Sequence, residues 1–246
     1  MNKNKTELIF GDFLSVAAGI PDNYFDMMLG DLPYGTTNCK WDSPIDLVQF
    51  WKEAERIVKP NGAIVLTAQT PFDKALGASN LKHLRYEWIW EKTQATGHLN
   101  AKKAPMKAHE NILVFYRNQP TYNPQKTNGH KPINSYTKYV ATQNKTALYN
   151  TVNKEITGGG ETDRYPRSVQ VFPSDKQREY FHSTQKPVAL FEYMIRTYTN
   201  PGDKVIDPTV GSGTTLVACQ NTGRIGTGVE NDRKIYEVAY KRLTTL

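Results

Sequence analysis

The feature that most constrains this fold is an alternation of short apolar strands with amphipathic helices, which stops once and then resumes. Between residues 47 and 58, apolar side chains recur at three- and four-residue spacing, which predicts a helix. Apolar runs typical of strands surround it, at 7–10, 24–29, 63–68, 86–91 and 112–116. After residue 186 the alternation returns, with helices expected at 187–199, 214–220 and 231–242 and strands at 205–207 and 225–229. Such alternation predicts an α/β fold with a mainly parallel sheet.

The stretch 119–181 interrupts this pattern. It has little periodicity, is rich in Asn, Thr, Lys and Tyr, and contains three consecutive glycines at 158–160. Structureless loops of this length are uncommon unless they are functional. We therefore expect one core in two halves, 1–118 and 182–246, with an irregular recognition insertion at 119–181; a partly disordered insertion is the alternative.

Composition narrows the class of protein. Lys and Arg number 31 against 24 Asp and Glu, a net charge of +7, which suits an anionic partner such as nucleic acid but also serves solubility. Mean hydropathy is −0.61, and no run approaches the ~18 apolar residues of a membrane span. No apolar stretch of signal-peptide length follows Met1, so we expect a cytoplasmic protein without membrane contact. Cys39 and Cys219 lie in no CxxC pattern, so neither a disulfide nor a metal site is expected.

A glycine-rich loop at 207–215 joins an expected strand to an expected helix. Its glycines let the backbone approach a ligand closely, and the helix start offers unpaired N–H groups. A P-loop would need a lysine after the last glycine, and a dinucleotide fingerprint would need glycine where Leu216 stands. A loop for a nucleoside cofactor remains, with Glu230 at the end of the next strand to bind ribose hydroxyls. The alternative is an ordinary structural turn.

A second motif, Asp31-Leu32-Pro33-Tyr34, also follows a strand. Ligands bind open α/β sheets at the carboxyl ends of the strands. A carboxylate beside an aromatic ring suits a planar ring that carries an exocyclic amine, since the acid accepts a hydrogen bond from the amine and the tyrosine stacks. By itself this motif is also compatible with an ordinary turn.

Together the two motifs resemble the S-adenosylmethionine-dependent DNA methyltransferases that methylate amino groups. The segment 31–34 resembles the catalytic Asp-Pro-Pro-Tyr motif, and 207–215 resembles the cofactor loop. The segment 182–187 is similar to the His-Pro-Thr-Gln-Lys-Pro segment of that family, and 107–115 is similar to its core strand before the recognition region. The order of these motifs is the permuted order of the beta class. Leu32, Thr209 and Ser183 depart from the pattern, and Thr209 replaces an expected phenylalanine near the cofactor.

The resemblance implies a Rossmann-like mixed sheet of seven strands, in the family order 3-2-1-4-5-7-6. This chain would supply strands 3, 4, 5, 6 and 7, then the insertion, then strands 1 and 2. Asp31 and Asp207 would then end neighbouring strands, which brings target and cofactor together.

The resemblance also implies roles for individual residues. The catalytic set is Asp31, Leu32 (through its carbonyl), Pro33 and Tyr34. The residues expected to bind S-adenosylmethionine are Asp12, Phe13, His182, Thr184, Lys186, Asp207, Pro208, Gly211, Ser212, Gly213, Thr214 and Glu230. For Thr184 and Lys186, capping of the following helix is the alternative.

Contacts with double-stranded DNA are expected from lysines for phosphates and from arginines for bases. The candidates are Lys102, Lys103, Lys107, Arg164, Arg167 and Trp41, where Trp41 would close over a flipped base or lie in the core.

The implied reaction is methylation of the adenine N6 amino group after base flipping. Neither cysteine fits the nucleophile that cytosine C5 methylation requires. Cytosine N4 methylation uses the same geometry and stays open, as do an RNA target and a non-catalytic nucleic-acid-binding protein on the same fold. A homodimer, a cognate restriction enzyme and a bacterial, phage or mobile-element source are further expectations from the resemblance.

Overall fold

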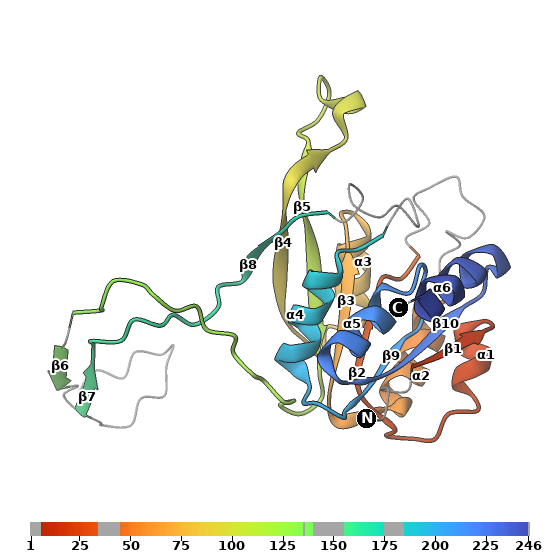
Figure 1. Ribbon diagram of the computed structural model, residues 1–246, viewed down its shortest axis with the longest axis horizontal. Coiled ribbons are helices and arrows are strands. Elements are labelled where there is room, and N and C mark those ends of the chain that lie inside the picture. Colours follow the sequence, from red (N-terminus) through yellow and green to blue (C-terminus); the bar gives the residue numbers. More distant parts are fainter. Residues whose placement is uncertain (1–5, 34–44, 135, 140–154, 175–184, 246) are drawn as a thin grey trace. The chain divides into compact units, whose positions relative to one another are not determined.

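A computed structural model of the chain describes residues 6–33, 45–134, 136–139, 155–174 and 185–245. Its centre is one mixed sheet of eight strands in the order β1-β10-β9-β2-β3-β5-β4-β8 (Figure 1). The strands of this sheet are β1 (Glu7–Phe10), β2 (Phe25–Gly30), β3 (Val58–Ala68), β4 (Leu84–Thr96), β5 (Lys107–Phe115), β8 (Val169–Phe172), β9 (Lys204–Asp207) and β10 (Ile225–Glu230). The first five strands in this order are parallel, β5 is antiparallel to both of its neighbours, and β8 is parallel to β4.

The predicted strand order is confirmed for seven of these strands. The eighth, β8, was not expected: it comes from the stretch predicted to be irregular and pairs with the outer edge of β4. The expectation of irregular structure at 169–172 was therefore wrong. The segment Val-Gln-Val-Phe does alternate apolar and polar residues, but its partner strand lies far away in the sequence, so only the fold reveals the pairing.

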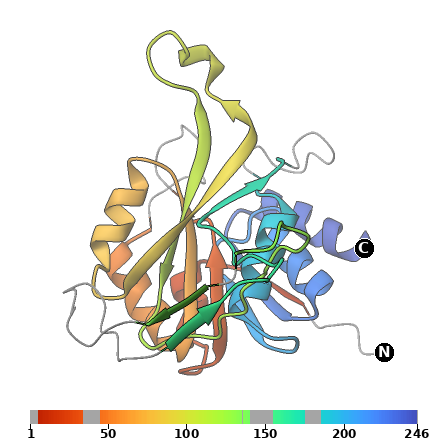
Figure 2. The same cartoon turned by 90° about the vertical axis from the view of Figure 1, so that its left-hand side faces the viewer.

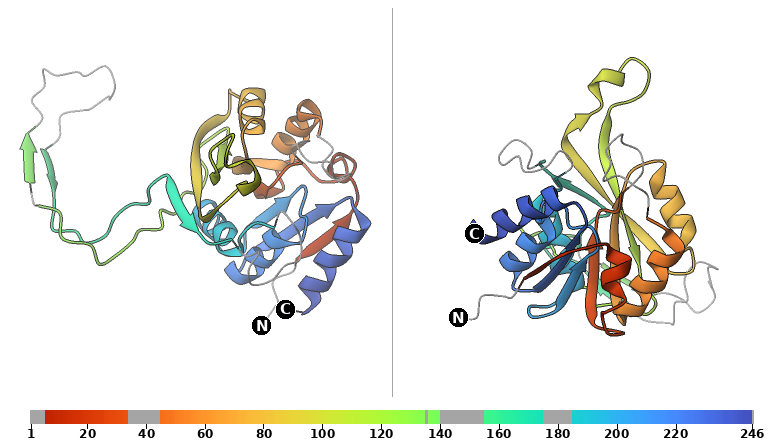
Figure 3. Two further views of the ribbon diagram at one scale, coloured as in Figure 1. Left: turned by 90° about the horizontal axis from the view of Figure 1, so that it is seen from above. Right: turned by 90° about the vertical axis from the view of Figure 1, so that its right-hand side faces the viewer.

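Helices cover both faces of the sheet, with the red and orange helices opposite the blue ones in Figure 3. The helices are α1 (Phe13–Ala17), α2 (Leu47–Ile57), α3 (Phe72–Ser79), α4 (Val188–Tyr198), α5 (Thr214–Thr222) and α6 (Arg233–Thr245). Side chains of α1, α2 and α3 share one buried cluster, and those of α4 and α5 share another. The sequence did not reveal α1 and α3, because they are too short to show a clear period.

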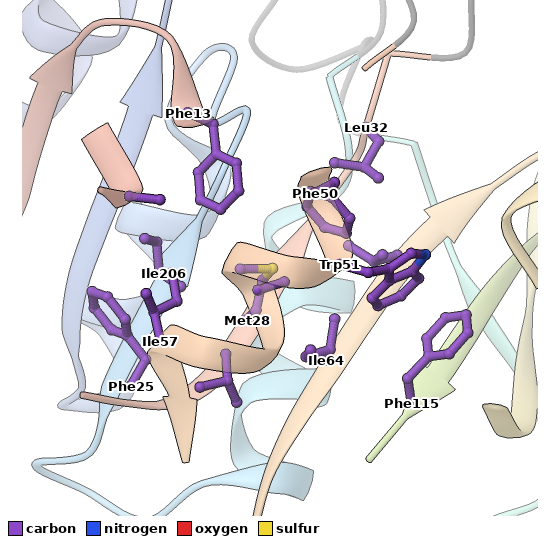
Figure 4. Packing of buried hydrophobic residues seen from close by; sticks show 14 of the residues in the cluster. Phe13, Phe25, Met28, Leu32, Phe50, Trp51, Ile57, Ile64, Phe115 and Ile206 are labelled. Atoms are coloured by element: carbon purple, nitrogen blue, oxygen red, sulfur yellow. The ribbon is translucent and has the colours of Figure 1, made fainter. Parts of the chain in front are cut away.

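Strand residues alternate between the two clusters, as the period of two requires. Met28 points to the α1–α3 side, where it lies among Phe13, Phe50 and Trp51 (Figure 4). Met27 and Leu29 point to the α4–α5 side. Because both faces are covered, β2 is apolar almost throughout, which is typical of a central parallel strand.

β4 and β5 continue past the sheet as a two-stranded arm, drawn in yellow-green at the top of Figure 2. Pairing continues to Thr96 and Lys107, and a short 3-10 turn (His98–Asn100) forms the tip. Residues 99–109, on the arm and its tip, are exposed, whereas β5 is buried from Glu110 onward. This arm carries Lys102, Lys103 and Lys107, three of the residues predicted to contact DNA.

A separate compact unit comprises residues 124–167. It contains a two-stranded antiparallel sheet of β6 (Tyr136–Tyr139) and β7 (Glu155–Gly158), and a single bridge joins Thr127 to Arg164. The prediction of irregular structure was therefore wrong for these strands too. Lys126 forms an ion pair with Asp163 at 2.8 Å within this unit.

Candidate active site

The carboxyl ends of the parallel strands gather the acidic residues that the sequence singled out. Asp31 follows β2, Asp207 ends β9 and Glu230 ends β10. β2 pairs directly with β9, and β9 with β10, so Asp31 and Asp207 lie at the ends of neighbouring strands as predicted. This edge is where an open α/β sheet binds ligands.

Asp31 is held at both carboxylate oxygens. Thr67 donates its hydroxyl hydrogen to Oδ1 at 2.5 Å, and the ammonium of Lys186 lies 2.5 Å from Oδ2. The side chain of Asp31 is nevertheless 23% exposed, so it borders the solvent. A carboxylate has about four lone-pair sites, so a single carboxylate can accept several hydrogen bonds at once.

The residue after Asp31 anchors this carboxylate to the core. The Leu32 side chain is buried within the α1–α3 cluster (Figure 4). Any role of Leu32 in binding must therefore come from its backbone, which agrees with the expectation that its carbonyl is the functional group. Tyr34 lies outside the described residues, as do Trp41, His182 and Thr184.

Lys186 belongs to a row of four charged side chains. Its Nζ lies 3.3 Å from Oε2 of Glu110, and Oε1 of Glu110 lies 2.6 Å from Nζ of Lys92. Burial acts to raise the pKa of Glu110, but the two lysines more than offset it, so this pKa lies below its usual value. Glu110 is therefore ionised. The sequence predicted that Lys186 binds the cofactor; the structure places its ammonium against the carboxylate of Asp31.

Asp207 has very different surroundings. It is 2% exposed, its Oδ1 accepts a hydrogen bond from the backbone N–H of Thr209, and its Oδ2 accepts one from the hydroxyl of Thr215. Burial, helped by the nearby charges of Asp31 and Glu230, raises the pKa of Asp207 to about 7 in spite of these two bonds. Asp207 thus shapes the loop that follows it.

The ends of β2 and β9 approach each other so closely that only glycine fits between them. A Cβ on Gly30 would lie 2.9 Å from Oδ1 of Asp207 and 2.9 Å from Cδ of Pro208. Thr209, which stands where the resemblance led us to expect phenylalanine, donates its hydroxyl hydrogen to the backbone carbonyl of Asp31 at 3.0 Å. A polar bond thus joins the two motifs at this position.

The glycine loop is fixed from three sides. Glu230 accepts a hydrogen bond from the N–H of Gly211 at 3.0 Å, and Arg242 donates to the carbonyl of Ser212 at 3.1 Å. Gly213 has a φ of 85°, which favours glycine, and stands at the N-cap position of α5. These contacts and this backbone conformation define the shape of the loop.

Glu230 was predicted to bind ribose hydroxyls, and it is a buried acid at the expected strand end. Its two oxygens accept hydrogen bonds from the N–H groups of Gly211 and Asp232. Burial raises its pKa above the ordinary value even so. Two acceptor bonds still leave lone pairs for hydroxyl groups.

Asp12 and Phe13 were also predicted to bind the cofactor. Asp12 follows β1 and caps α1 by accepting a hydrogen bond from the N–H of Ser15 at 3.1 Å. Phe13 is buried and packs against Phe50 with ring centroids 5.7 Å apart. Both residues lie at the correct sheet edge, but their observed contacts are structural.

The predicted DNA-contacting residues fall in two places. Lys102, Lys103 and Lys107 are exposed on the arm. Within the unit 124–167, Arg167 is exposed, whereas Arg164 donates hydrogen bonds to three backbone carbonyls of its own unit.

Sequence reasoning missed several residues of this site, namely Thr67, Lys92, Glu110 and Arg242. Glu110 carried a signal: it is an acid inside the segment 107–115 and directly precedes five apolar or amide residues of a buried strand. An acid at such a position is buried and needs a cationic partner. The sequence does not say which lysine that partner is.

These features define an α/β protein of the methyltransferase fold, with a preformed loop and a presented carboxylate on adjacent strands. The chain belongs to the DNA methylase family of N6 and N4 methyltransferases, whose model matches residues 25–241. It is therefore a DNA methyltransferase, and its cofactor is S-adenosylmethionine.

Two relatives illustrate this membership. The chain is 29% identical to the type II methyltransferase M.HpaI of Haemophilus parainfluenzae, over 96% of this chain and 73% of that protein. It is 26% identical to the type II methyltransferase M.BglII of Bacillus subtilis, over 95% and 68% of the two chains.

Solved structures show the same fold. The complex of M1.HpyAVI with S-adenosylmethionine has a TM-score of 0.63 at 21% identity, covering 96% of this chain and 99% of the other. The cytosine-N4-specific PvuII DNA methyltransferase has a TM-score of 0.70 at 14% identity, covering 97% and 87%. No helix in the described part of the chain is long and apolar enough to cross a membrane.

The residues at this edge fit S-adenosylmethionine. The space where a Cβ of Gly211 would project is open to at least 4 Å, so a ligand can approach that backbone. The N-terminus of α5 is next to it, and the carboxylate of Glu230 lies beside the loop. A loop of this kind that lacks the P-loop lysine suits a nucleoside better than a phosphate.

Proposed function

We propose that this enzyme transfers the methyl group of S-adenosylmethionine to the N6 amino group of adenine in duplex DNA after the base is flipped out. The observation that carries the proposal is the carboxylate of Asp31. It lies 2.5 Å from the ammonium of Lys186, is partly exposed, and follows the strand next to the one that leads into the glycine loop. The resemblance adds that members with Asp at this position are mostly adenine enzymes.

In this proposal Asp31 accepts a hydrogen bond from the exocyclic amino group, and the carbonyl of Leu32 accepts the other. These bonds fix the nitrogen and turn its lone pair toward the cofactor. Tyr34, with Pro33 fixing the backbone before it, stacks on the flipped base. Most of the rate acceleration then comes from positioning and from negative charge placed where positive charge develops.

The cofactor side is the loop from Asp207 and Pro208 to Thr214. When bound, S-adenosylmethionine supplies an electrophilic methyl group on a sulfonium. Gly211, Ser212 and Gly213 let the backbone approach it, and Glu230 accepts hydrogen bonds from its ribose hydroxyls. Asp12, Phe13, His182 and Thr184 remain predicted contacts on the same side.

The DNA side combines the arm with the insertion. The lysines of the arm, Lys102, Lys103 and Lys107, bind phosphates, and Arg164 and Arg167 contribute to recognition from the unit 124–167. Trp41 closes over the flipped base. Phosphate contacts of this kind weaken steeply with salt.

Two partners besides DNA belong to the proposal. M.HpaI and M.BglII are named type II methyltransferases. We propose that this enzyme likewise methylates one short DNA site, works beside a restriction enzyme of the same specificity in the cytoplasm of its host, and forms a homodimer. Light scattering tests the dimer, and sequencing of methylated positions tests the single short site.

The test of the proposed reaction is transfer of a labelled methyl group from S-adenosylmethionine to unmethylated genomic DNA, followed by mass spectrometry of the nucleosides. We expect N6-methyladenine. N4-methylcytosine would keep the mechanism and change the base. Methylated RNA alone, or cofactor binding without transfer, would contradict the proposal.

A further inference from the structure

We propose that Lys186, Glu110 and Lys92 are positioning residues for methyl transfer, which hold the carboxylate of Asp31 in place and set the net charge behind it. This inference rests on the proposed function, since it assumes that Asp31 receives the target amino group.

The row is built from alternating charges at short distances. From Asp31 to Lys186 the distance is 2.5 Å, from Lys186 to Glu110 3.3 Å, and from Glu110 to Lys92 2.6 Å. The side chains of Lys186, Glu110 and Lys92 are 9%, 5% and 7% exposed, against 23% for Asp31. Asp31 is thus the accessible end of an otherwise buried row.

Three separate segments supply the buried members. Lys92 comes from β4, Glu110 from β5, and Lys186 from the residues just before α4. The ammonium of Lys92 also lies 5.1 Å from the centre of the Trp90 ring. The backbone carbonyl of Lys186 accepts a hydrogen bond from Thr214, the first residue of α5, at 3.4 Å. The row is therefore fixed at several points of the core.

Stability does not explain the row. Burying four charges is costly, and well-packed apolar side chains of similar volume are often as stable or more stable. The arrangement is useful at Asp31, because a carboxylate that is already held in position does not have to move when the target amino group becomes positive during methyl transfer.

The charge balance explains why Glu110 is needed. Asp31, Lys186, Glu110 and Lys92 sum to zero. With a neutral side chain at position 110, the net charge behind Asp31 would rise from +1 to +2, and the four positions would sum to +1 instead of zero. That excess positive charge would oppose the positive charge that develops on the target nitrogen.

The experiment measures kcat and the KM values for S-adenosylmethionine and DNA in four variants, with total methyl transfer as the readout. Lys186→Met and Glu110→Gln each lower kcat about 10–100-fold, with both KM values within about threefold of wild type. Lys186→Arg keeps the charge and recovers most of the lost rate. Lys59→Met removes an ion pair of similar length, with Asp26 at 2.6 Å, near the starts of β2 and β3 and so at the ends opposite the active site, and leaves kcat unchanged.

A double variant tests whether Glu110 acts through Lys186. Adding Glu110→Gln to Lys186→Met lowers kcat by less than the product of the two single effects, because both changes remove the same support. Thermal unfolding of each variant identifies any loss that comes from misfolding, and rates are then compared only among folded proteins.

Several results would overturn the inference. One is a Lys186→Met enzyme with wild-type kcat. Another is a raised KM for S-adenosylmethionine at unchanged kcat, which would make Lys186 a cofactor ligand. A third is a loss that Lys186→Arg fails to recover although that variant is folded. A wild-type protein that transfers no methyl to DNA would overturn the proposed function, and this inference with it.

Discussion

Asp31 and Asp207 stand at the ends of neighbouring strands, yet they differ in almost every physical respect. Asp31 is partly exposed and paired with a lysine. Asp207 is buried, accepts hydrogen bonds from a backbone N–H and a hydroxyl, and has a pKa raised by burial to about 7. The same residue type on the same edge therefore serves two purposes: one carboxylate is presented, and the other shapes a loop.

The difference teaches how a single edge accommodates two ligands. Direct contact between the strand ends, through Gly30 and Thr209, keeps them at a fixed separation. The surroundings of the two acids then differ: Asp31 is paired with Lys186, whereas burial raises the pKa of Asp207. Each of the following predictions alters one side of this comparison.

The largest effect is expected at Asp31. Asp31→Asn keeps the shape and removes the negative charge, so methyl transfer falls by at least about 100-fold, because the developing positive charge loses its partner. The dissociation constant for S-adenosylmethionine changes by less than about threefold. Rates of methyl transfer and calorimetric titration of the cofactor provide the two measurements, and an active variant would refute the role of Asp31.

The second effect concerns pH and Asp207. With a folded-state pKa near 7 and an ordinary value of 3.8, the folded protein holds a proton that the unfolded chain has released. This group therefore stabilises the fold at acidic pH, and its contribution is lost as pH rises through 7. Between pH 5 and pH 8 the loss is about 2–3 kcal/mol.

Asp207→Asn removes this dependence. Urea unfolding at each pH gives the free energy of unfolding of both proteins. Between pH 5 and pH 8, the variant should gain about 2–3 kcal/mol relative to wild type. An unchanged difference would mean that Asp207 is charged at both pH values.

The third effect comes from the contact between the strand ends. Gly30→Ala forces a methyl group against Asp207 and Pro208, which costs about 1–3 kcal/mol of folding free energy. Gly19→Ala serves as the control for glycine replacement, since its φ is not positive and a Cβ there meets only the carbonyl oxygen of Val16 at an ordinary 3.6 Å. If Gly30→Ala is no less stable than wild type, the strand ends are not in contact.

The smallest effect is expected at Thr209. Thr209→Val removes the hydroxyl that bonds the Asp31 carbonyl and should lower kcat by about two- to tenfold, the value of one ordinary hydrogen bond. Thr209→Ser retains the hydroxyl and should stay close to wild type. Equal rates for valine and serine would show that this bond does not position Asp31.

Much of the fold could be predicted because its signals are local. The strand at 63–68 is an almost continuous apolar run, and Asp31 and Asp207 mark the ends of β2 and β9. These two ends could therefore be placed together once the strand order was expected. β8 escaped prediction because its four residues pair with a distant strand, and α1 escaped because five residues show no period.

The residues of the site also fall into two groups, those that the sequence reveals and those that only the fold brings together. Asp31, Asp207 and Glu230 are visible in the sequence because each follows a strand. The row behind Asp31 is not visible, because Lys92, Glu110 and Lys186 meet only through the packing of β4, β5 and the start of α4. No spacing rule links residues on separate elements.

The most direct test of this account measures two quantities on the same preparations: the dissociation constant for S-adenosylmethionine, and the single-turnover rate of methyl transfer at saturating cofactor. The variants are Asp31→Asn and Gly211→Ala, since a Cβ on Gly211 projects into the space beside the loop. We expect Asp31→Asn to lose the methyl-transfer rate and keep its affinity for S-adenosylmethionine. We expect the opposite for Gly211→Ala, with the affinity reduced about tenfold or more and the rate largely kept. If both folded variants lost both the rate and the affinity, the two strand ends would not have separate roles in methyl transfer and cofactor binding.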